Sequence, residues 1–159
     1  MTQEIHRIAI NTGGGDAPGL NAVIRAAVLS ALNRGWECIG IREGYNGLLL
    51  PEQYPEGGLM PLTRETVRGI THLGGTILGT TNRGSPLKYP TPGPDGQLYE
   101  KDRTDEIMAA FQQHRLDALI AIGGVEEAEG GRIEVMAQIC LTAGQGEVRV
   151  AVGQVFILA

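Results

Sequence analysis

Cysteine is scarce in this sequence, which has two thiols, Cys38 and Cys140, far apart along the chain. Both stand in apolar stretches, so we interpret them as small buried residues of a protein kept in a reducing compartment. A disulfide between them is the alternative. No apolar run approaches the ~20 residues that a membrane helix needs, and the polar residues 1–7 lack the apolar core of a signal peptide. These absences favour a cytoplasmic protein without a membrane partner.

An excess of positive charge is also missing. The chain carries 13 Lys and Arg residues against 18 Asp and Glu residues, for a formal net charge of -5. Because binding to a phosphate backbone requires clustered cations, nucleic acid is not expected as a partner. Aromatic residues make up only 4% of the 159 residues, whereas glycine occurs 24 times. So many glycines in a chain of one-domain length predict positions where the backbone turns sharply or meets a ligand.

The first forty residues alternate between apolar runs and glycines. Residues 7–11 (RIAIN) form a short apolar run that ends at a glycine cluster, which is typical of a buried parallel strand. An apolar stripe on Leu20–Asn33 predicts a helix that stops near Gly35, and Glu37–Ile41 predicts a second strand. A strand, helix and strand joined in this way form a right-handed parallel unit that binds ligands at the carboxyl ends of its strands. The expected fold class is therefore α/β.

Later segments continue the alternation of helices and strands. A helix is predicted at residues 102–114, with Ile107, Ala110 and Phe111 facing inward, and a buried strand follows at residues 116–122. Proline, glycine and capping residues indicate further turns and ends. The remaining predictions are an exposed excursion at 51–61, a short helix beginning at Thr63, a strand or loop at 74–79, a long surface loop at 86–96, a helix at 133–142 and a strand at 148–158.

A glycine-rich segment, TGGGDAPGLN at residues 12–21, stands between the first strand and the first helix. Unpaired backbone N–H groups and the helix dipole attract anionic oxygen at such a place, and glycines let a phosphate approach the backbone. A glycine turn without a ligand is the alternative, although a bare turn rarely needs so many adjacent glycines. The segment is neither a Walker loop nor the spaced Rossmann fingerprint. It predicts a site for the phosphates of a nucleotide.

Four segments, in order, carry a resemblance to a known family. They are GGDAPGLNAVIR at residues 14–25, GYNGL at 44–48, GGTILG at 74–79 with Arg83 after it, and LIAIGG at 119–124. Together they resemble the nucleotide-binding part of the phosphofructokinases. The resemblance implies a Rossmann-like three-layer fold with a parallel sheet flanked by helices, incomplete in this chain. Residues 1–124 would be the nucleotide-binding part, and residues 125–159 a remnant of the substrate-binding half.

The resemblance also implies an activity. Members of the family transfer a phosphoryl group from ATP, with Mg²⁺, to the glycolytic sugar fructose 6-phosphate, and they are homo-oligomers. The glycines would lie against the nucleotide phosphates, with a tyrosine near the adenosine and an arginine at a phosphate. The positions that match these roles are Gly14, Gly15, Tyr45, Arg83 and Gly124.

Two arginines need separate comment. Arg83 is one position beyond the directly aligned residue, Asn82, so an ordinary surface arginine is the alternative for it. By the same resemblance Arg25 maps to an effector site between subunits. The second arginine of that effector site is replaced by Leu29 in this chain.

The chain departs from the family pattern after Gly124. The family continues with an aspartate that holds Mg²⁺, whereas Val125 follows here and cannot ligate a metal. Glu126 or Glu127 is the alternative oxygen donor. We therefore assign no metal ligand.

Residues 147–152 resemble, weakly, a much later stretch of the phosphofructokinases, and the family segment that contains the aspartate acting as general base has no counterpart here. Phosphoryl transfer depends on positioning, metal charge and a base for the incoming hydroxyl. We assign no catalytic residue and expect the activity of this chain to be impaired. The alternatives to an ATP-dependent kinase are a pyrophosphate-dependent member, a non-catalytic nucleotide-binding remnant, and a truncated or rearranged product.

Overall fold

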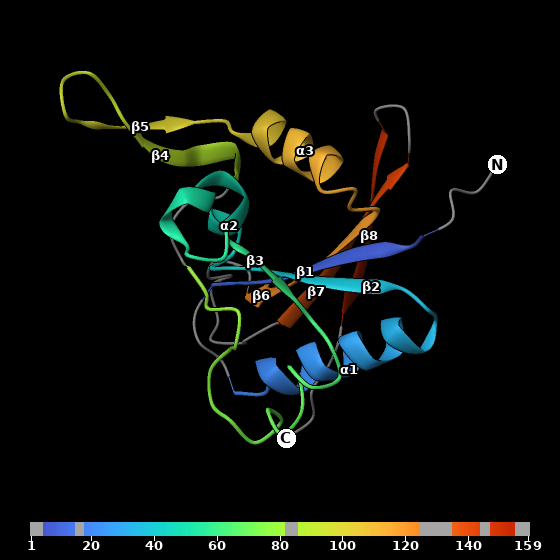
Figure 1. The fold of residues 1–159 in the computed structure, drawn as a ribbon. Coiled ribbons are helices and arrows are strands. Elements are labelled where there is room, and N and C mark those ends of the chain that lie inside the picture. Colours follow the sequence, from blue (N-terminus) through green and yellow to red (C-terminus); the bar gives the residue numbers. More distant parts are fainter. Residues whose placement is uncertain (1–4, 15–17, 82–85, 125–134, 144–146, 155–159) are drawn as a thin grey trace.

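A computed structural model of the protein describes residues 5–14, 18–81, 86–124, 135–143 and 147–154 (Figure 1). Within these residues, six strands form one sheet in the order β3-β2-β1-β6-β7-β8, and β4 and β5 form a separate hairpin. The strands are β1 (Arg7–Gly13), β2 (Glu37–Ile41), β3 (Leu59–Pro61), β4 (Tyr89–Pro92), β5 (Leu98–Lys101), β6 (Ala118–Gly124), β7 (Val135–Ala143) and β8 (Glu147–Gln154). The helices are α1 (Leu20–Asn33), α2 (Asn46–Leu49) and α3 (Thr104–Gln113), with short 3-10 turns at Pro51–Gln53 and Pro86–Lys88.

The centre of the sheet is parallel. Strand β1 runs parallel to both of its neighbours, with Ile8 opposite Cys38 of β2 and Ala118 of β6. The outer strands β3, β7 and β8 pair antiparallel with their neighbours. Helix α1 covers one face of the sheet, and α2 and α3 lie on the other (Figure 1). The predicted α/β class, with a parallel sheet core between helices, is confirmed, and the antiparallel strands are an addition to it.

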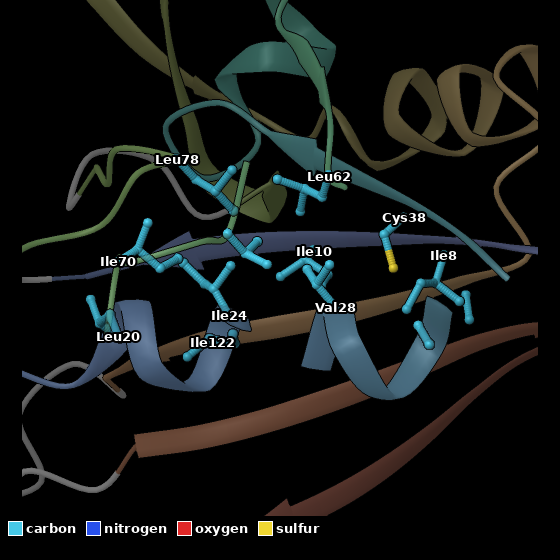
Figure 2. Packing of buried hydrophobic residues seen from close by; sticks show 13 residues of the cluster. Ile8, Ile10, Leu20, Ile24, Val28, Cys38, Leu62, Ile70, Leu78 and Ile122 are labelled. Atoms are coloured by element: carbon cyan, nitrogen blue, oxygen red, sulfur yellow. The ribbon is translucent and has the colours of Figure 1, made fainter. Parts of the chain in front are cut away.

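Alternate residues of β1 belong to two different cores. Ile8 and Ile10 pack with Ile24 and Val28 of α1 on one face of the sheet (Figure 2). Ala9, which lies between them, belongs to the cluster on the opposite face. This alternation is the period of two that a strand imposes on its side chains. Because full burial of an isoleucine or valine side chain contributes about 1.5–3 kcal/mol, packing on both faces holds β1 firmly in the sheet.

The elements nearest the glycine loop match their predictions. Helix α1 and strand β2 span the residues that the sequence predicts for them. Helix α3 lies within the predicted residues 102–114 and buries Ile107 and Phe111, with Ala110 half-buried. Strand β1 continues two residues further than predicted, to Gly13. In the described ranges, no helix is long and apolar enough to cross a membrane.

The predicted long loop at residues 86–96 is wrong. The structure has a 3-10 turn and then the β4–β5 hairpin, whose turn is closed by Gly93, with its N–H donating to the Gln97 carbonyl at 2.8 Å. Pro90 and Pro92 lie in β4, where proline is tolerated because this two-stranded ribbon leaves one edge of each strand unpaired. In the sequence these prolines suggest a loop. They interrupt only part of the hydrogen-bond ladder, however, so the two strands still pair.

The predicted helix at residues 133–142 is also wrong, because the structure has strand β7 there. Strand β7 pairs antiparallel with β6, and β8 pairs with β7 in turn. Pairing across a sheet depends on distant segments and routinely overrides local helix propensity. The strand predicted at residues 148–158 is present as β8, which begins one residue earlier, and the end of the predicted range lies outside the described residues.

The segment that begins at Thr63 forms turns rather than the short helix that the sequence predicts. Thr63 and Thr66 nevertheless bond each other as a helix start does. The Thr63 N–H donates to Thr66 Oγ1 at 2.7 Å, and the Thr66 N–H donates to Thr63 Oγ1 at 3.3 Å. The threonines thus stabilise a single turn, and regular helix does not continue beyond it.

Cys38 is a free thiol in the core between the sheet and α1, on the face of β2 that packs against this helix. Burial raises the pKa of this thiol to about 11, because the charged thiolate is disfavoured away from water. This state confirms the interpretation of Cys38 as a small apolar core residue. Cys140 lies on β7, and its side chain is outside the described part of the structure.

Candidate functional site

Three loops meet at the carboxyl edge of the parallel strands. The glycine loop follows β1, a second loop that carries Tyr45 follows β2, and residues 73–81, which we name the strap, lie against both. The edge also includes the end of β6, where Gly123 pairs with Gly13 of β1. A Cβ at Gly123 would lie 2.6 Å from the Gly13 carbonyl oxygen, so the two strand ends approach too closely for any other residue.

The amino end of α1 is the most favourable place for an anion at this edge. The helix begins after Gly19, whose φ of 94° lies in the left-handed region. Within the described residues no side chain caps this end of the helix, and its first turn contains no acidic residue. The first N–H groups of a helix have no partner within the helix and carry the positive end of its dipole. This end therefore suits a phosphate or another anionic oxygen.

The strap holds the start of the glycine loop. Thr12, at the end of β1, donates from Oγ1 to the Gly79 carbonyl at 2.7 Å and lies 3.0 Å from Thr76 Oγ1. Gly14, with a φ of 79°, donates its N–H to the Thr81 carbonyl at 3.1 Å. Its own carbonyl accepts a hydrogen bond from Thr80 Oγ1. These contacts fix the backbone of the loop from its first residues.

The strap also holds the end of the glycine loop, through Asn21 in the first turn of α1. The Asn21 side-chain nitrogen donates to the Leu73 carbonyl at 3.1 Å, and its oxygen accepts the Ile77 N–H at 2.9 Å. Only 2% of this asparagine is exposed. A buried amide needs partners for both its donor and its acceptor, and this one finds them on the strap.

The second loop places Tyr45 beside β1. Glu43 and Gly44 both have positive φ, 46° and 68°, which turns the chain sharply after β2. The side-chain nitrogen of Asn11 donates to the Gly44 carbonyl at 3.3 Å, while Asn11 Oδ1 is buried and has no hydrogen-bond partner among the described residues. The Glu43 N–H donates to the Leu78 carbonyl at 3.0 Å, so the strap holds this loop too.

Glu43, the acidic residue of this second loop, has a hydrogen-bond partner. Tyr54 donates from its hydroxyl to Glu43 Oε2 at 3.1 Å. Burial, and then the hydrogen bond and negative charge of Glu43, raise the pKa of Tyr54 to about 12. Nearby, Arg42 pairs with Glu56 at 2.8 Å and donates to the Ile77 carbonyl at the same distance. The rim of the site is therefore internally paired at neutral pH.

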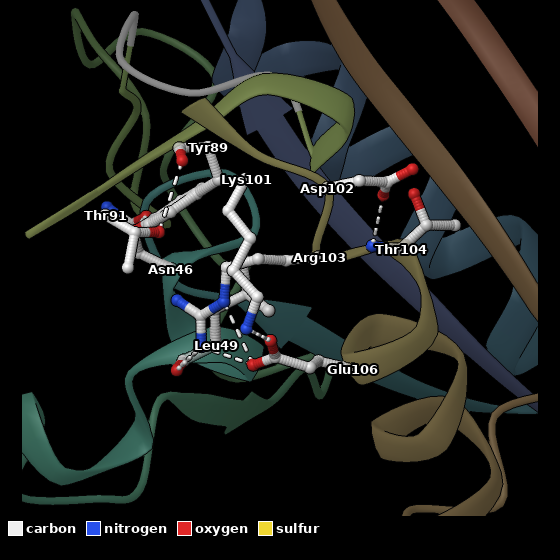
Figure 3. Close-up of polar contacts among 9 residues, drawn as sticks. All are labelled: Asn46, Leu49, Tyr89, Thr91, Lys101, Asp102, Arg103, Thr104 and Glu106. Carbon is white, nitrogen blue, oxygen red and sulfur yellow. Dashed lines mark hydrogen bonds and ion pairs between the residues drawn. The ribbon is translucent and has the colours of Figure 1, made fainter. Parts of the chain in front are cut away.

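Helix α2, directly after Tyr45, is anchored to the β4–β5 hairpin and to α3 (Figure 3). Tyr89 donates from its hydroxyl to Asn46 Oδ1 at 2.7 Å, and the Arg103 guanidinium lies 5.0 Å from the centre of the Tyr89 ring. Arg103 also donates to the Leu49 carbonyl at 3.2 Å and pairs with Glu106. These contacts set the position of α2, and so of the residue that precedes it.

Among the site residues predicted from the sequence, Gly14, Tyr45 and Gly124 lie at the carboxyl edge of the sheet, on the glycine loop, the second loop and the end of β6. Gly15 and Arg83 lie outside the described residues. Arg25 is half-buried on α1. The functions assigned to these residues stay predictions.

Sequence reasoning placed Thr12 and Asn21 in the glycine-rich segment without a role of their own, and it gave no role to Asn11 or Thr80. A signal for some of them was present, because Asn11, Thr12 and Asn21 interrupt apolar patterns at positions that the strand and helix bury. A polar residue at a buried position implies a hydrogen-bond partner. The sequence does not indicate that the partners lie on residues 73–81.

A divalent cation requires oxygen or nitrogen donors gathered in one place. In the part of the chain that the structure describes, no group of three or more His, Cys, Asp or Glu side chains lies close enough to hold a metal ion. The described side chains thus form no metal site made of protein ligands alone, and we derive no step through the metal.

Comparison with known proteins agrees with this arrangement. The family model for phosphofructokinase matches residues 7–139. ATP-dependent 6-phosphofructokinase 1 of Synechocystis is 42% identical over 142 residues, which are 89% of this chain and 36% of that protein. The Nostoc protein of the same name is 48% identical over 119 residues, which are 74% of this chain and 31% of that protein. The chain thus spans about a third of the length of these curated relatives.

Solved structures give the same result. The structure of phosphofructokinase from Saccharomyces cerevisiae superimposes with a TM-score of 0.57 at 31% sequence identity, covering 75% of this chain and 14% of that one. The Pichia pastoris phosphofructokinase in the T-state gives the same TM-score and identity over 78% of this chain and 12% of that one. On the family match, the identity to these relatives and the shared fold, this chain belongs to the phosphofructokinase family.

Proposed function

We propose that this chain is the nucleotide-binding part of an ATP-dependent 6-phosphofructokinase, a phosphotransferase of glycolysis. In this proposal residues 1–124 bind the nucleotide and residues 125–159 are a remnant of the substrate-binding half. The observation that carries it is the amino end of α1, which follows a glycine-rich segment, has no acid in its first turn and has no side-chain cap among the residues that the structure describes. An N-terminus of this kind favours phosphate oxygens.

Five residues have proposed contacts with ATP. Gly14 and Gly15 would let the phosphates approach the loop backbone, and Gly124 would do the same at the end of β6. Tyr45 would lie near the adenosine. Arg83 would pair with a phosphate, for which its planar guanidinium has the right geometry.

The full reaction of the family would convert ATP and fructose 6-phosphate into ADP and fructose 1,6-bisphosphate. Bound Mg²⁺ would supply positive charge to the transferred group. In this chain Val125 stands where the family has its metal-binding aspartate, and no residue is assigned as the base. We therefore expect this chain to bind ATP. Its turnover should be several orders of magnitude lower than that of an enzyme with a positioned base and a bound metal ion.

The proposal also covers the ligands, the assembly and the cellular location of the protein. The small-molecule partners would be the nucleotide and fructose 6-phosphate, and the assembly would be a homo-oligomer with Arg25 near an effector site. A location in the cytoplasm is proposed as well, which the free buried thiol of Cys38 supports.

A pyrophosphate-dependent phosphofructokinase is the second candidate. The pyrophosphate–fructose 6-phosphate 1-phosphotransferase of Dictyoglomus thermophilum is 42% identical to this chain over 118 residues, 29% of that protein. Both donors present a pyrophosphate group to a glycine loop, so the loop alone does not distinguish them. A non-catalytic nucleotide-binding module is the third candidate, favoured by Val125.

Calorimetric titration with a non-hydrolysable ATP analogue, and separately with pyrophosphate, tests the proposal. Saturable binding of the analogue, tighter than that of pyrophosphate, is the expected result, because adenosine adds contacts at Tyr45. A coupled assay for fructose 1,6-bisphosphate, with ATP and Mg²⁺, measures turnover in the same preparation. Tighter binding of pyrophosphate would favour the second candidate, and no binding of either ligand by the folded chain would refute the site.

A further inference from the structure

The strap, residues 73–81, bonds the chain on both sides of the glycine loop. It bonds Thr12 and Gly14 where the loop begins and Asn21 where the loop ends. We propose that the strap sets the loop in its phosphate-binding form, and that Thr12 and Asn21 are positioning residues for phosphate recognition. The inference deepens the proposed function, since it requires that the loop binds phosphate.

The contacts before the loop form one directed series of hydrogen bonds. A hydroxyl has a single proton, and Thr12 uses it for the Gly79 carbonyl at 2.7 Å. Thr76 must then donate to Thr12 Oγ1, which lies 3.0 Å away. Thr76 Oγ1 in turn accepts the Leu78 N–H at 3.2 Å. Thr12 is fully buried, so each of these groups depends on the others rather than on water.

After the loop, Asn21 bridges two parts of the strap. Its nitrogen donates to Leu73 and its oxygen accepts from Ile77, as described above. The amide cannot be reversed without losing both bonds, because each strap partner offers only one type of group. Asn21 stands in the first turn of α1, so the strap fixes the N–H groups of that turn relative to β1.

The contact at Gly14 shows which groups remain for a ligand. Its N–H donates to Thr81 and its carbonyl accepts from Thr80, so both of its backbone groups are occupied by the strap. Gly14 thus anchors the loop and, because it has no side chain, still lets a phosphate approach without donating a hydrogen bond to it. Among the described residues of this edge, the amino end of α1 offers donors for a ligand, because Gly19 at its N-cap has no side chain to bond them.

An anchored loop binds more tightly than a free one. Ordering a loop residue on binding costs roughly 1–2 kcal/mol of conformational entropy. Fixing the two ends of the loop in advance avoids part of that cost, which is the usual benefit of preorganisation. The contacts are neutral and buried, so the benefit should not depend on ionic strength.

Two substitutions at Thr12 test the proposal. Thr12→Val has nearly the same shape but no hydroxyl, and Thr12→Ser keeps the hydroxyl. The dissociation constants of ATP and of adenosine are measured for both variants and for the original chain. Thr12→Val should weaken ATP binding roughly tenfold, the effect of about one lost buried hydrogen bond, and change adenosine binding less than about twofold. Thr12→Ser should restore ATP binding.

Asn21→Ala should act like Thr12→Val, and Asn33→Ala is its matched control. Asn33 ends the same helix, is exposed, and accepts a hydrogen bond from Arg64 at 2.5 Å, far from the strap. Unchanged ATP binding in Thr12→Val and Asn21→Ala would overturn the proposal. An equal loss of ATP and adenosine binding would overturn it too, because that is the effect of general destabilisation.

Hydrogen exchange separates this inference from the proposed function. If the strap anchors the loop, the amides of Gly14 and Leu78, which donate in these contacts, should exchange faster in Thr12→Val than in the original chain, and at the original rate in Thr12→Ser. A chain that binds no nucleotide refutes the proposed function, and the exchange rates then decide on the anchoring alone. Equal rates in all three proteins would overturn the anchoring.

Discussion

The carboxyl edge of the sheet and the corner between α3 and the β4–β5 hairpin are held by different kinds of contact. At the carboxyl edge, Thr12 and Asn21 are at most 2% exposed, and they bond neutral backbone groups of the strap. At the corner, Glu106 pairs with Arg103 and Lys101 while 42% of its side chain is exposed. The difference suggests that precise positions are kept by buried neutral bonds, and that exposed charges add little.

The energies of the two kinds of contact differ in the same direction. Removing one partner of a buried hydrogen bond leaves the other without water and costs about 1–3 kcal/mol. An exposed ion pair contributes about 0–1 kcal/mol and is screened by salt. Substitutions at the carboxyl edge should therefore have larger effects than those at the corner, and the predictions below follow that order.

The largest effect is expected for Gly123→Ala. Its Cβ would lie 2.6 Å from the Gly13 carbonyl oxygen, a backbone atom that cannot move alone. We expect a loss of about 2–3 kcal/mol in the free energy of unfolding, measured by urea denaturation. Gly13→Ala is the control, because nothing lies within 4 Å of a Cβ at that paired position. Equal stability of the two variants would show that the strand ends are not closely packed.

Tyr89→Phe should have the next largest effect. It removes the hydroxyl that donates to Asn46 Oδ1 at 2.7 Å from a side chain that is largely buried. The expected loss is about 1 kcal/mol in the free energy of unfolding, by the same measurement. Tyr99→Phe serves as the control, since Tyr99 is exposed and its hydroxyl bonds the exposed Asp95. A loss as large at Tyr99 as at Tyr89 would contradict the importance of burial.

Glu106→Gln tests the exposed corner through pH. Hydrogen bonds from Arg103 and then Lys101 lower the pKa of Glu106 to about 2, below the ~4.3 of an unfolded glutamate. A lowered folded pKa stabilises the protein above the unfolded pKa, and this stabilisation disappears as pH falls from about 4 to about 2. We expect a contribution under about 1 kcal/mol after solvent screening. The original chain should lose its advantage over the variant in that window, and high salt should reduce the advantage at pH 7.

The smallest effect concerns Cys38 and changes reactivity rather than stability. Burial holds the pKa of its thiol near 11, so the folded protein contains almost no thiolate at pH 8. In a Cys140→Ser background, a thiol reagent should label Cys38 slowly in the native state and rapidly in urea. The raised pKa also means that this thiol favours the folded state below its unfolded pKa and loses that preference as pH rises towards 11. Rapid native labelling at pH 8 would contradict the burial.

How far the sequence predicts the structure depends on the range of the contacts. Helix α1 and strand β2 were predictable because a glycine loop precedes the helix and Gly35 follows it, both local signals. The site was not predictable to the same depth. Thr12 contacts Gly79, and Asn21 contacts Leu73, across more than fifty residues. The spacing of apolar residues along the sequence gives no signal for contacts over such a distance.

The elements that sequence reasoning predicted wrongly show the same limit. Strand β7 forms where it pairs with β6, although its own residues also suit a helix. The β4–β5 hairpin forms in spite of Pro90 and Pro92 because the hydrogen bonds at its turn do not involve them. In both cases pairing with another segment decided the outcome, and the sequence pattern described only one partner.

Titration calorimetry of the 159-residue chain with ATP, beside a Gly15→Val variant, is the decisive test of the proposed nucleotide site. A valine side chain in the glycine loop would keep phosphate away from the backbone. The account predicts saturable binding of ATP by the original chain and at least about tenfold weaker binding by a folded variant, because the ligand loses about one strong contact. Equal affinity of the two proteins, or no binding by the folded original chain, would contradict it.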